Sequence, residues 1–403
     1  MHIWILSHYA SPPTGSGTTR HAGLARYLCE AGHSVVVFSS ALGHNHHGGN
    51  LEVPDGEMFV DREYDGVLFR FVRTRPYHNA PERFLNNMSF RANALRSTGG
   101  LPRPDVVIGS SVHLHAADAG LRLARRYGAR FVAEIRDIWP ETLVDLRLTT
   151  RWSPTYWYLR VLELRVYRNA ELVIGLMPGL GEYLESLGIP SDRFLYVPNG
   201  FDPARFPELG PPPAEGPFVC SLFGSHAPSD GIVHIVRAAE ILQRDPRGEG
   251  IHVRLVGDGP CKPDLIRLAG ELGLRNIEFR DVVPKPELLP IAETSHAFIY
   301  NHPYMPIVER YGMSPNKIFE YLAMSRPVLV ACKSLNDPVR EAGAGLTVTP
   351  GDPHALAEGM IALRDTPPDE RAAMARRGRE YAVENHDLRK LAVRIERRLV
   401  EIP

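Results

Sequence analysis

The residues best suited to chemistry lie in the segment YGMSPNKIFEYLAMSRP, residues 311–327. A small polar loop, Ser314-Pro315-Asn316, precedes a helical pattern that carries Lys317 in its first turn and Glu320 one turn in. The N-terminus of a helix presents free N–H groups and a partial positive charge, which attract a diphosphate. Lys317 would add a full positive charge where a nucleoside diphosphate leaves. Glu320, about 5 Å further along, could accept hydrogen bonds from ribose hydroxyls. An ordinary capped helix without a ligand explains the same residue pattern equally well.

Four other segments extend this interpretation, namely GSGTTRHAGLARYLCEAGHSVVVFS (15–39), EIRDIWPETL (134–143), VPNGFD (197–202) and LVGDGP (255–260). Together with SPNKIFEYLAMSRPVL, and in this order, they resemble segments of family 4 retaining glycosyltransferases. The resemblance is greatest to the bacterial amino-sugar and deoxy-sugar transferases of surface polysaccharide and glycoconjugate biosynthesis. It implies the α/β fold called GT-B, in which two doubly wound, Rossmann-like domains face a central cleft. The C-terminal domain of such enzymes binds the donor, and the N-terminal domain binds the acceptor.

The pattern along the chain is independently consistent with such a fold. Short apolar strands alternate with helical patterns, which is typical of parallel sheets covered on both faces. Strands are expected at 2–7, 34–39, 67–72, 105–110, 131–136, 172–177, 194–198, 218–224, 253–259, 277–282, 297–302, 327–332 and 346–350. A chain of 403 residues is too long for one ordinary core.

We therefore expect an N-terminal acceptor domain over residues 1–205 and a C-terminal donor domain over residues 206–385. The proline-rich segment 207–217 is the predicted linker. The amphipathic helix in 386–403 would, by the resemblance, cross back to the N-terminal domain.

Three groups in the first half are predicted to face the ligand. Gly15-Ser16-Gly17 could let the backbone approach the donor, as this loop does in relatives, or could be a flexible connection. His113 and Asp137 each follow a predicted strand, and strand C-termini line the ligand edge of such sheets. In other branches of the family a histidine at the place of His113 contacts the donor sugar; a hydrogen-bonded loop histidine is the alternative. Asp137 could deprotonate an acceptor hydroxyl or pair with Arg136.

The second half departs from the wider family in two places. Gly312 stands where many members have the first of two glutamates, which puts the identity of the sugar in doubt. The segment SHAPSDG, residues 225–231, replaces an arginine and a lysine that usually meet the diphosphate. His226 could contribute there when protonated, but Lys317 becomes the main cation. In relatives, backbone near Val283 reads the base.

The predicted catalytic residues are thus Lys317, Glu320, His113 and Asp137. The predicted donor-binding residues are Gly15, Ser16, Gly17, Gly224, Ser225, Asp258, Val283, Ser314, Pro315, Asn316, Lys317, Ile318 and Glu320.

Composition narrows the partners. With a formal charge of −1 the chain has no overall positive field to attract nucleic acid, so we expect no nucleic-acid partner. No apolar run reaches the ~18 residues that span a bilayer, and Met1 leads straight into a strand, so we expect a cytoplasmic protein, at most touching the inner membrane face. The tract at His44, His46 and His47 reads as a loop rather than a metal site. The segments 83–96 and 151–169 mix arginine with aromatic residues and could meet lipid or a polyprenyl phosphate, although core packing explains both.

The resulting hypothesis is a retaining, metal-independent glycosyltransferase without a cofactor. It would move a hexose or N-acetylhexosamine, deoxy forms included, from a UDP-sugar to a sugar, lipid-linked or small-molecule acceptor. The absence of any Asp-x-Asp in the sequence is the basis for expecting no metal. Two alternatives stay open: a UDP-sugar epimerase on the same architecture and a non-catalytic nucleotide-sugar-binding subunit.

Overall fold

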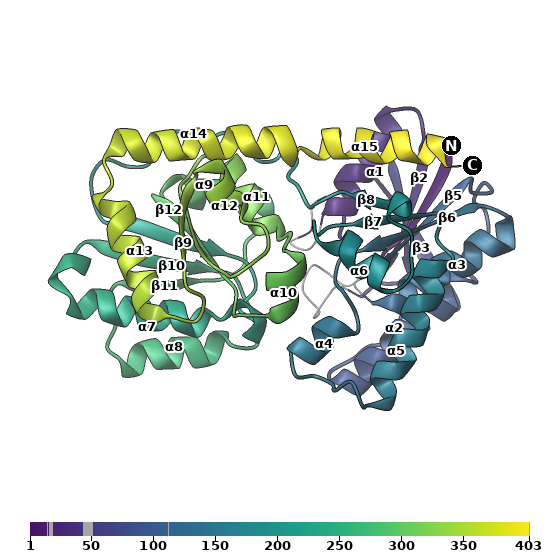
Figure 1. Cartoon of the computed structure of the whole chain (residues 1–403), viewed down its shortest axis with the longest axis horizontal. Helices are drawn as coiled ribbons and strands as arrows, with labels where there is room; N and C mark the ends of the chain where they lie inside the picture. Colours follow the sequence, from purple (N-terminus) through teal and green to yellow (C-terminus); the bar gives the residue numbers. More distant parts are fainter. Residues whose placement is uncertain (14, 16–18, 43–50, 112, 403) are drawn as a thin grey trace. The chain divides into compact units, whose positions relative to one another are not determined.

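The computed structural model describes residues 1–13, 15, 19–42, 51–111 and 113–402. The chain divides into two compact units (Figure 1). Unit 1 comprises residues 1–198 together with the C-terminal segment from Leu388, and unit 2 comprises residues 199–387. Each unit is an α/β layer structure with its own sheet, so the predicted class of two doubly wound domains is confirmed.

Unit 1 contains an eight-stranded sheet in the order β3-β4-β2-β1-β5-β6-β7-β8. Its neighbouring strands are parallel except for the antiparallel pair β3–β4. Buried runs such as SVVVFSS form its interior because both faces are covered by helices. The strands are β1 (His2–Leu6), β2 (Ser34–Ser40), β3 (Phe59–Tyr64), β4 (Val67–Val72), β5 (Val106–Ser111), β6 (Arg130–Ile135), β7 (Leu172–Gly175) and β8 (Phe194–Tyr196).

The helices of unit 1 include the last one in the chain. They are α1 (Arg20–Glu30), α2 (Ala80–Ala94), α3 (Leu114–Tyr127), α4 (Glu141–Asp145), α5 (Pro154–Arg168), α6 (Leu180–Ser186) and α15 (Leu388–Glu401). Helix α15 packs its apolar stripe of Leu391, Ile395 and Leu399 into the same core as α1. The two helices approach closely at Gly23, where an added Cβ would lie 2.6 Å from Leu388 Cδ1.

Unit 2 contains a parallel six-stranded sheet in the order β11-β10-β9-β12-β13-β14. This is the 3-2-1-4-5-6 order, in which the topology reverses between β9 and β12, and ligands of such sheets bind beyond the strand C-termini at that reversal. The strands are β9 (Phe218–Phe223), β10 (Ile251–Val256), β11 (Ile277–Arg280), β12 (Ala297–Asn301), β13 (Val328–Ala331) and β14 (Gly345–Val348).

The helices of unit 2 cover both faces of this sheet (Figure 1). They are α7 (Ile232–Arg244), α8 (Lys262–Glu271), α9 (Lys285–Glu293), α10 (Pro306–Tyr311), α11 (Asn316–Ala323), α12 (Pro338–Ala342), α13 (Pro353–Asp365) and α14 (Pro368–Asn385). The proline-rich segment 207–217 lies inside unit 2. Phe206, just before the segment, and Leu209, within it, are buried in a core cluster of that unit, whereas the rest of the segment is exposed or half-buried. No helix in the described part of the chain is long and apolar enough to cross a membrane.

Candidate functional site

The donor residues predicted in unit 2 gather at one edge of its sheet. Val256 is in register with both Phe223 and Arg280, so β9, β10 and β11 end at the same level. The loops that follow these strands therefore meet at the reversal of the topology. At this edge the Lys317 ammonium, in the first turn of α11, lies 2.7 Å from Asp230 Oδ1 in the loop after β9.

The loops at this edge approach one another so closely that glycine is required. Gly224 has φ +133° and Gly257 has φ +152°, values that favour glycine. A Cβ on Gly257 would lie 1.8 Å from Gly224 O, and a Cβ on Gly259 would lie 2.6 Å from His226 O. The glycine turn GDG after β10 is thus a backbone-to-backbone contact with the loop after β9.

Helix α11 is fixed at the edge by its buried side. Ile318 is fully buried, and Tyr321 Oη accepts from Phe223 N–H (2.9 Å) and donates to Phe223 O (3.1 Å). The Ser314 hydroxyl and carbonyl accept from the Asn199 N–H (2.7 Å) and side-chain amide, which anchors the preceding loop. No described side chain caps the helix at Pro315, so the first N–H groups of α11 keep their capacity for an anionic ligand.

His226 differs from what the sequence indicated. Its ring is fully buried, and neither ring nitrogen has a hydrogen-bond partner among the described residues. Burial, together with the positive charges of Lys262 and Lys317, lowers the pKa of His226 to about 4. The ring is therefore neutral at neutral pH, and the contribution that a protonated His226 could make is disfavoured by desolvation and by like charges.

Lys262 was missed by the sequence reasoning. It is buried, and its Nζ donates to Gly257 O (2.9 Å) and Arg280 O (3.0 Å) and pairs with Asp281 Oδ1 (2.6 Å). It therefore ties the loop after β10 to the loop after β11. Asp230 was missed as well, because its partner Lys317 lies 87 residues away in sequence. The only available signal was an acidic residue where the family usually offers a cation.

The remaining predicted donor residues differ in solvent exposure and in the unit that contains them. Ser225 and Asp258 are exposed, whereas Asn316 and Glu320 are half-buried in the first turns of α11. Val283 packs against a core cluster. Gly15, in unit 1, is buried, and Ser16 and Gly17 lie outside the described residues, as do His44, His46 and His47.

In unit 1 the ends of β5 and β6 are level, since Ser111 is in register with Ile135. Strand β1 ends two residues earlier, where Leu6 is in register with Gly109. His113 Nε2 lies 2.8 Å from His8 Nδ1, and His113 Nδ1 accepts from Ala116 N–H (3.4 Å) at the start of α3. Burial and the neighbouring histidines hold the pKa of His113 well below its usual value. The ring is thus a neutral helix cap whose bonds are made within the protein. Asp137 is half-buried in the loop after β6.

A buried ionic cluster lies in the same unit. Glu134 accepts from Arg20 Nε (3.0 Å), from the Ser110 hydroxyl (2.6 Å) and from His21 Nε2 (2.6 Å). Burial alone would raise the pKa of Glu134, but His21, Arg20 and Ser110 hold it well below its usual value. Arg20 also donates to the carbonyls of Val197 and Pro198. The cluster therefore joins α1, two strands and the end of the segment leading out of unit 1.

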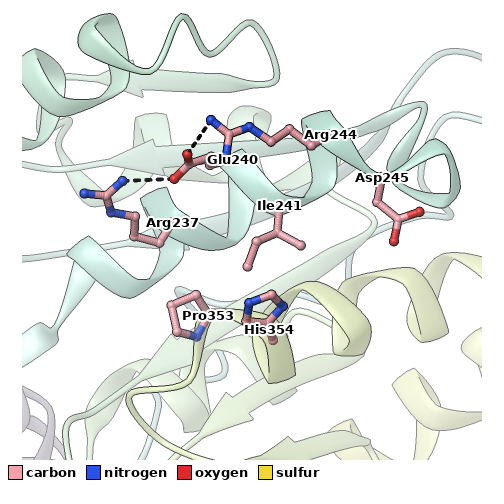
Figure 2. A pocket seen from close by; sticks show the side chains of 7 residues that line it. All are labelled: Arg237, Glu240, Ile241, Arg244, Asp245, Pro353 and His354. Atoms are coloured by element: carbon pink, nitrogen blue, oxygen red, sulfur yellow. Dashed lines mark hydrogen bonds and ion pairs between the residues drawn. The ribbon is translucent and has the colours of Figure 1, made fainter.

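The segments 83–96 and 151–169 both contribute to packing. Phe90 is fully buried and stacks on His8, with ring centroids 4.6 Å apart. A separate cavity of about 520 Å³ lies between α7 and α13, lined by Arg237, Glu240, Ile241, Arg244, Asp245, Pro353 and His354 (Figure 2). It contains none of the predicted donor residues, and Glu240 is already paired with Arg237 (3.0 Å) and Arg244 (2.8 Å).

Two family models match consecutive parts of the chain. Residues 15–200 match the glycosyl transferase 4-like domain, and residues 217–366 match glycosyl transferases group 1. Among curated protein sequences, none matches the chain.

Several solved structures share the fold along the full length. Sucrose-phosphate synthase from Thermosynechococcus elongatus superposes with a TM-score of 0.73 at 16% identity, covering 100% of this chain and 98% of that one. Anabaena HepE in complex with UDP and glucose gives 0.66 at 15% identity, with 99% of both chains covered. The Escherichia coli trehalose-6-phosphate protein bound with UDP-2-fluoro glucose gives 0.72 at 14% identity, with 100% of both chains covered. At these identities the likeness concerns the fold alone, which is the GT-B fold.

Proposed function

We propose that this chain transfers a hexosyl or N-acetylhexosaminyl group from a UDP-sugar. The chain belongs to the glycosyltransferases, because a glycosyl transferase 4-like domain and a glycosyl transferases group 1 domain follow one another along it. The acceptor is a sugar, a lipid-linked sugar or a small molecule. The transfer retains the anomeric configuration and needs no metal ion. The choice of uridine is supported by structural neighbours in complex with UDP, UDP-glucose and UDP-2-fluoro glucose.

The observation that carries the proposal is the position of Lys317. Its ammonium lies over Gly224, beside Asp230, at the uncapped start of α11 and at the C-terminal edge of the sheet. A diphosphate at this edge meets a full positive charge and free N–H groups. As the bond between the sugar carbon and the phosphate oxygen breaks, the leaving diphosphate gains negative charge, which Lys317 and these N–H groups stabilise.

The acceptor attacks from the face that the diphosphate leaves. Its hydroxyl oxygen forms the new bond to the sugar carbon, and its proton passes to an oxygen of the leaving phosphate. No protein base is required for this proton balance. Glu320, half-buried one turn into α11, accepts hydrogen bonds from the ribose hydroxyls and so orients the nucleoside.

The test is a transfer assay with the full chain, a panel of UDP-sugars and a panel of acceptors. UDP release and product mass are measured with and without a chelator. We expect UDP release that depends on an acceptor and resists the chelator. Lys317→Met should lower turnover by about 10²-fold, the typical loss of one oxyanion-stabilising donor. Lys333→Met is the matched control, because Lys333 is an exposed lysine of unit 2 paired with Glu309.

Each contrary result has its own meaning. Interconversion of UDP-sugars without an acceptor would replace the transferase with the epimerase alternative. Nucleotide-sugar binding without turnover across all acceptors would favour the non-catalytic subunit. Release that the chelator abolishes would overturn the metal-independent mechanism.

A further inference from the structure

The segment from α4 to α5 in unit 1 concentrates exposed apolar side chains. The described part of the chain has fourteen exposed large hydrophobic residues, and six of them lie within residues 146–161. Trp152 is 91% exposed, Leu148 72% and Val161 64%. Scattered exposed hydrophobic residues are normal, but a local concentration marks an interaction surface. We call these six residues the aromatic face: Leu146, Leu148, Trp152, Trp157, Tyr158 and Val161.

Packing within unit 1 does not account for this face, because α5 uses other positions for the core. Its buried side consists of Tyr156, Leu159, Leu162, Glu163, Val166 and Tyr167. Trp157 and Val161 are four residues apart and share the exposed side. Tyr158 lies at the border, with its hydroxyl 3.1 Å from His115 Nε2 and its ring centroid 5.9 Å from that of Phe84 on α2. Helix α5 is tied to α4 by the Tyr156 hydroxyl, which donates to Glu141 Oε1 (2.6 Å), and α2, α4 and α5 all belong to unit 1 (Figure 1).

The exposed charges around the aromatic face have one sign. Within residues 141–169 the exposed charged side chains are Arg147, Arg151 and Arg168. The glutamates of the segment are engaged inside it: Glu141 is held by Arg151, Arg160 and the Tyr156 hydroxyl, and Glu163 is buried against Arg160 and the Tyr183 hydroxyl. The third carboxylate in the segment, Asp145 on α4, is half-buried. The exposed charged side chains of the segment are therefore guanidinium groups, beside the apolar side chains of the aromatic face.

We propose that the aromatic face docks this chain onto a membrane surface that carries anionic lipid headgroups. Tryptophan and tyrosine favour the headgroup region, where the ring is apolar and its N–H or O–H stays hydrated. Leu148 and Val161 reach toward the acyl boundary, and arginines pair with lipid phosphates. An apolar protein partner would not require this one-sided charge. The inference rests on unit 1 alone and goes beyond the proposed transfer reaction.

The test measures binding of the full chain to phosphatidylcholine vesicles with and without phosphatidylglycerol. The variant is Trp152→Ser with Trp157→Ser, and the matched control is Ile266→Ser with Val400→Ser, two exposed positions on α8 and α15. We expect wild type and control to sediment with the anionic vesicles, and the tryptophan variant to bind at least about tenfold more weakly at an unchanged melting temperature. Arg147→Glu should weaken binding to anionic vesicles only, and added salt should do the same.

Three outcomes would overturn the proposal. Wild type could fail to bind anionic vesicles at low salt. The tryptophan variant could bind as well as the control. Light scattering could reveal a dimer of the wild-type chain that the tryptophan variant dissociates, without vesicle binding; the aromatic face would then be a contact between two copies of this chain.

Discussion

Lys317 lies directly against Gly224: a Cβ built on Gly224 would stand 2.4 Å from Lys317 Cε and 2.9 Å from Lys317 Nζ. The loop after β9 and the first turn of α11 are therefore in contact, with the Lys317 side chain packed against the backbone of Gly224. The same ammonium is 2.7 Å from Asp230 Oδ1, so its position is defined from two sides. This arrangement makes the charge at the proposed diphosphate site sensitive to a single methyl group.

Gly224→Ala should therefore weaken donor binding more than it weakens the fold. The new methyl displaces the flexible end of Lys317, and the positive φ adds backbone strain of about 1 kcal/mol. We expect affinity for UDP, measured by calorimetry, to fall about tenfold or more, since tenfold corresponds to 1.4 kcal/mol. Gly270→Ala on α8 is the control, because a Cβ there meets nothing within 4 Å. Equal UDP affinity in Gly224→Ala and wild type would contradict a diphosphate at Lys317.

Asp230→Asn should have the opposite effect on product binding. The Lys317–Asp230 pair is partly exposed, and a diphosphate must compete with the Asp230 carboxylate for the ammonium. Such pairs contribute up to about 1 kcal/mol, so affinity for UDP should rise by up to about fivefold. Glu309→Gln, which removes the exposed partner of Lys333, should leave UDP affinity unchanged. Weaker UDP binding in Asp230→Asn would mean that Asp230 chiefly positions Lys317.

The fold could be predicted because its signals are local. Each of the thirteen strands expected from apolar runs overlaps a strand of the structure, and a helix follows most of them in the described residues. Among the residues that the structure describes, the strand that was missed is β3, which pairs antiparallel with β4 through a turn at Asp65 (φ 51°) and Gly66 (φ 76°). A tight turn of this kind has a sequence signal, which is Asp-Gly between two segments of alternating hydrophobic and polar residues. A search for continuous apolar runs does not detect it.

The candidate site was only partly accessible from the sequence, because its charges depend on contacts between distant segments. Lys317 and Gly224 were identified from local pattern and resemblance, yet the pairing of Lys317 with Asp230 has no local signal. His226 illustrates the second difficulty: its residue type indicated a cation, and burial makes it neutral. Whether Glu320, His113 and Asp137 act in catalysis stays a prediction.

Glu134→Gln should destabilise unit 1 strongly. The change leaves the Arg20 guanidinium buried without its counter-charge, which typically costs about 3–5 kcal/mol. All four tryptophans of the chain lie in unit 1, so tryptophan fluorescence during urea titration reports on that unit. Glu401→Gln, which removes an exposed partner of Arg398 in the same unit, should change stability by less than about 0.5 kcal/mol. A similarly small change in Glu134→Gln would show that Arg20 is adequately held by the carbonyls of Val197 and Pro198.

The stability of unit 1 should fall as the pH drops from about 6.5 toward 4, in part because of His115. Burial, and then the charge of Arg91, lower the pKa of His115 to about 4, whereas the unfolded chain has its ordinary value near 6.5. Between these values the unfolded state binds more protons, so the free energy of unfolding rises with pH and is lost as pH falls. The titration of His115 alone should make the free energy of unfolding about 2 kcal/mol lower at pH 5 than at pH 7.5.

His115→Phe isolates that contribution, because a phenyl ring can keep the ring contact with Phe84, at 5.2 Å between centroids, without titrating. The variant loses the hydrogen bond to Tyr158 at every pH, so its stability is lower at pH 7.5. The decisive quantity is the difference between pH 7.5 and pH 5, measured by urea titration with tryptophan fluorescence. That difference should be about 2 kcal/mol smaller in His115→Phe than in wild type. If the difference in the free energy of unfolding between the two pH values were equal in both proteins, His115 would have its ordinary pKa in the folded chain. Its ring would then be accessible to water when it becomes protonated.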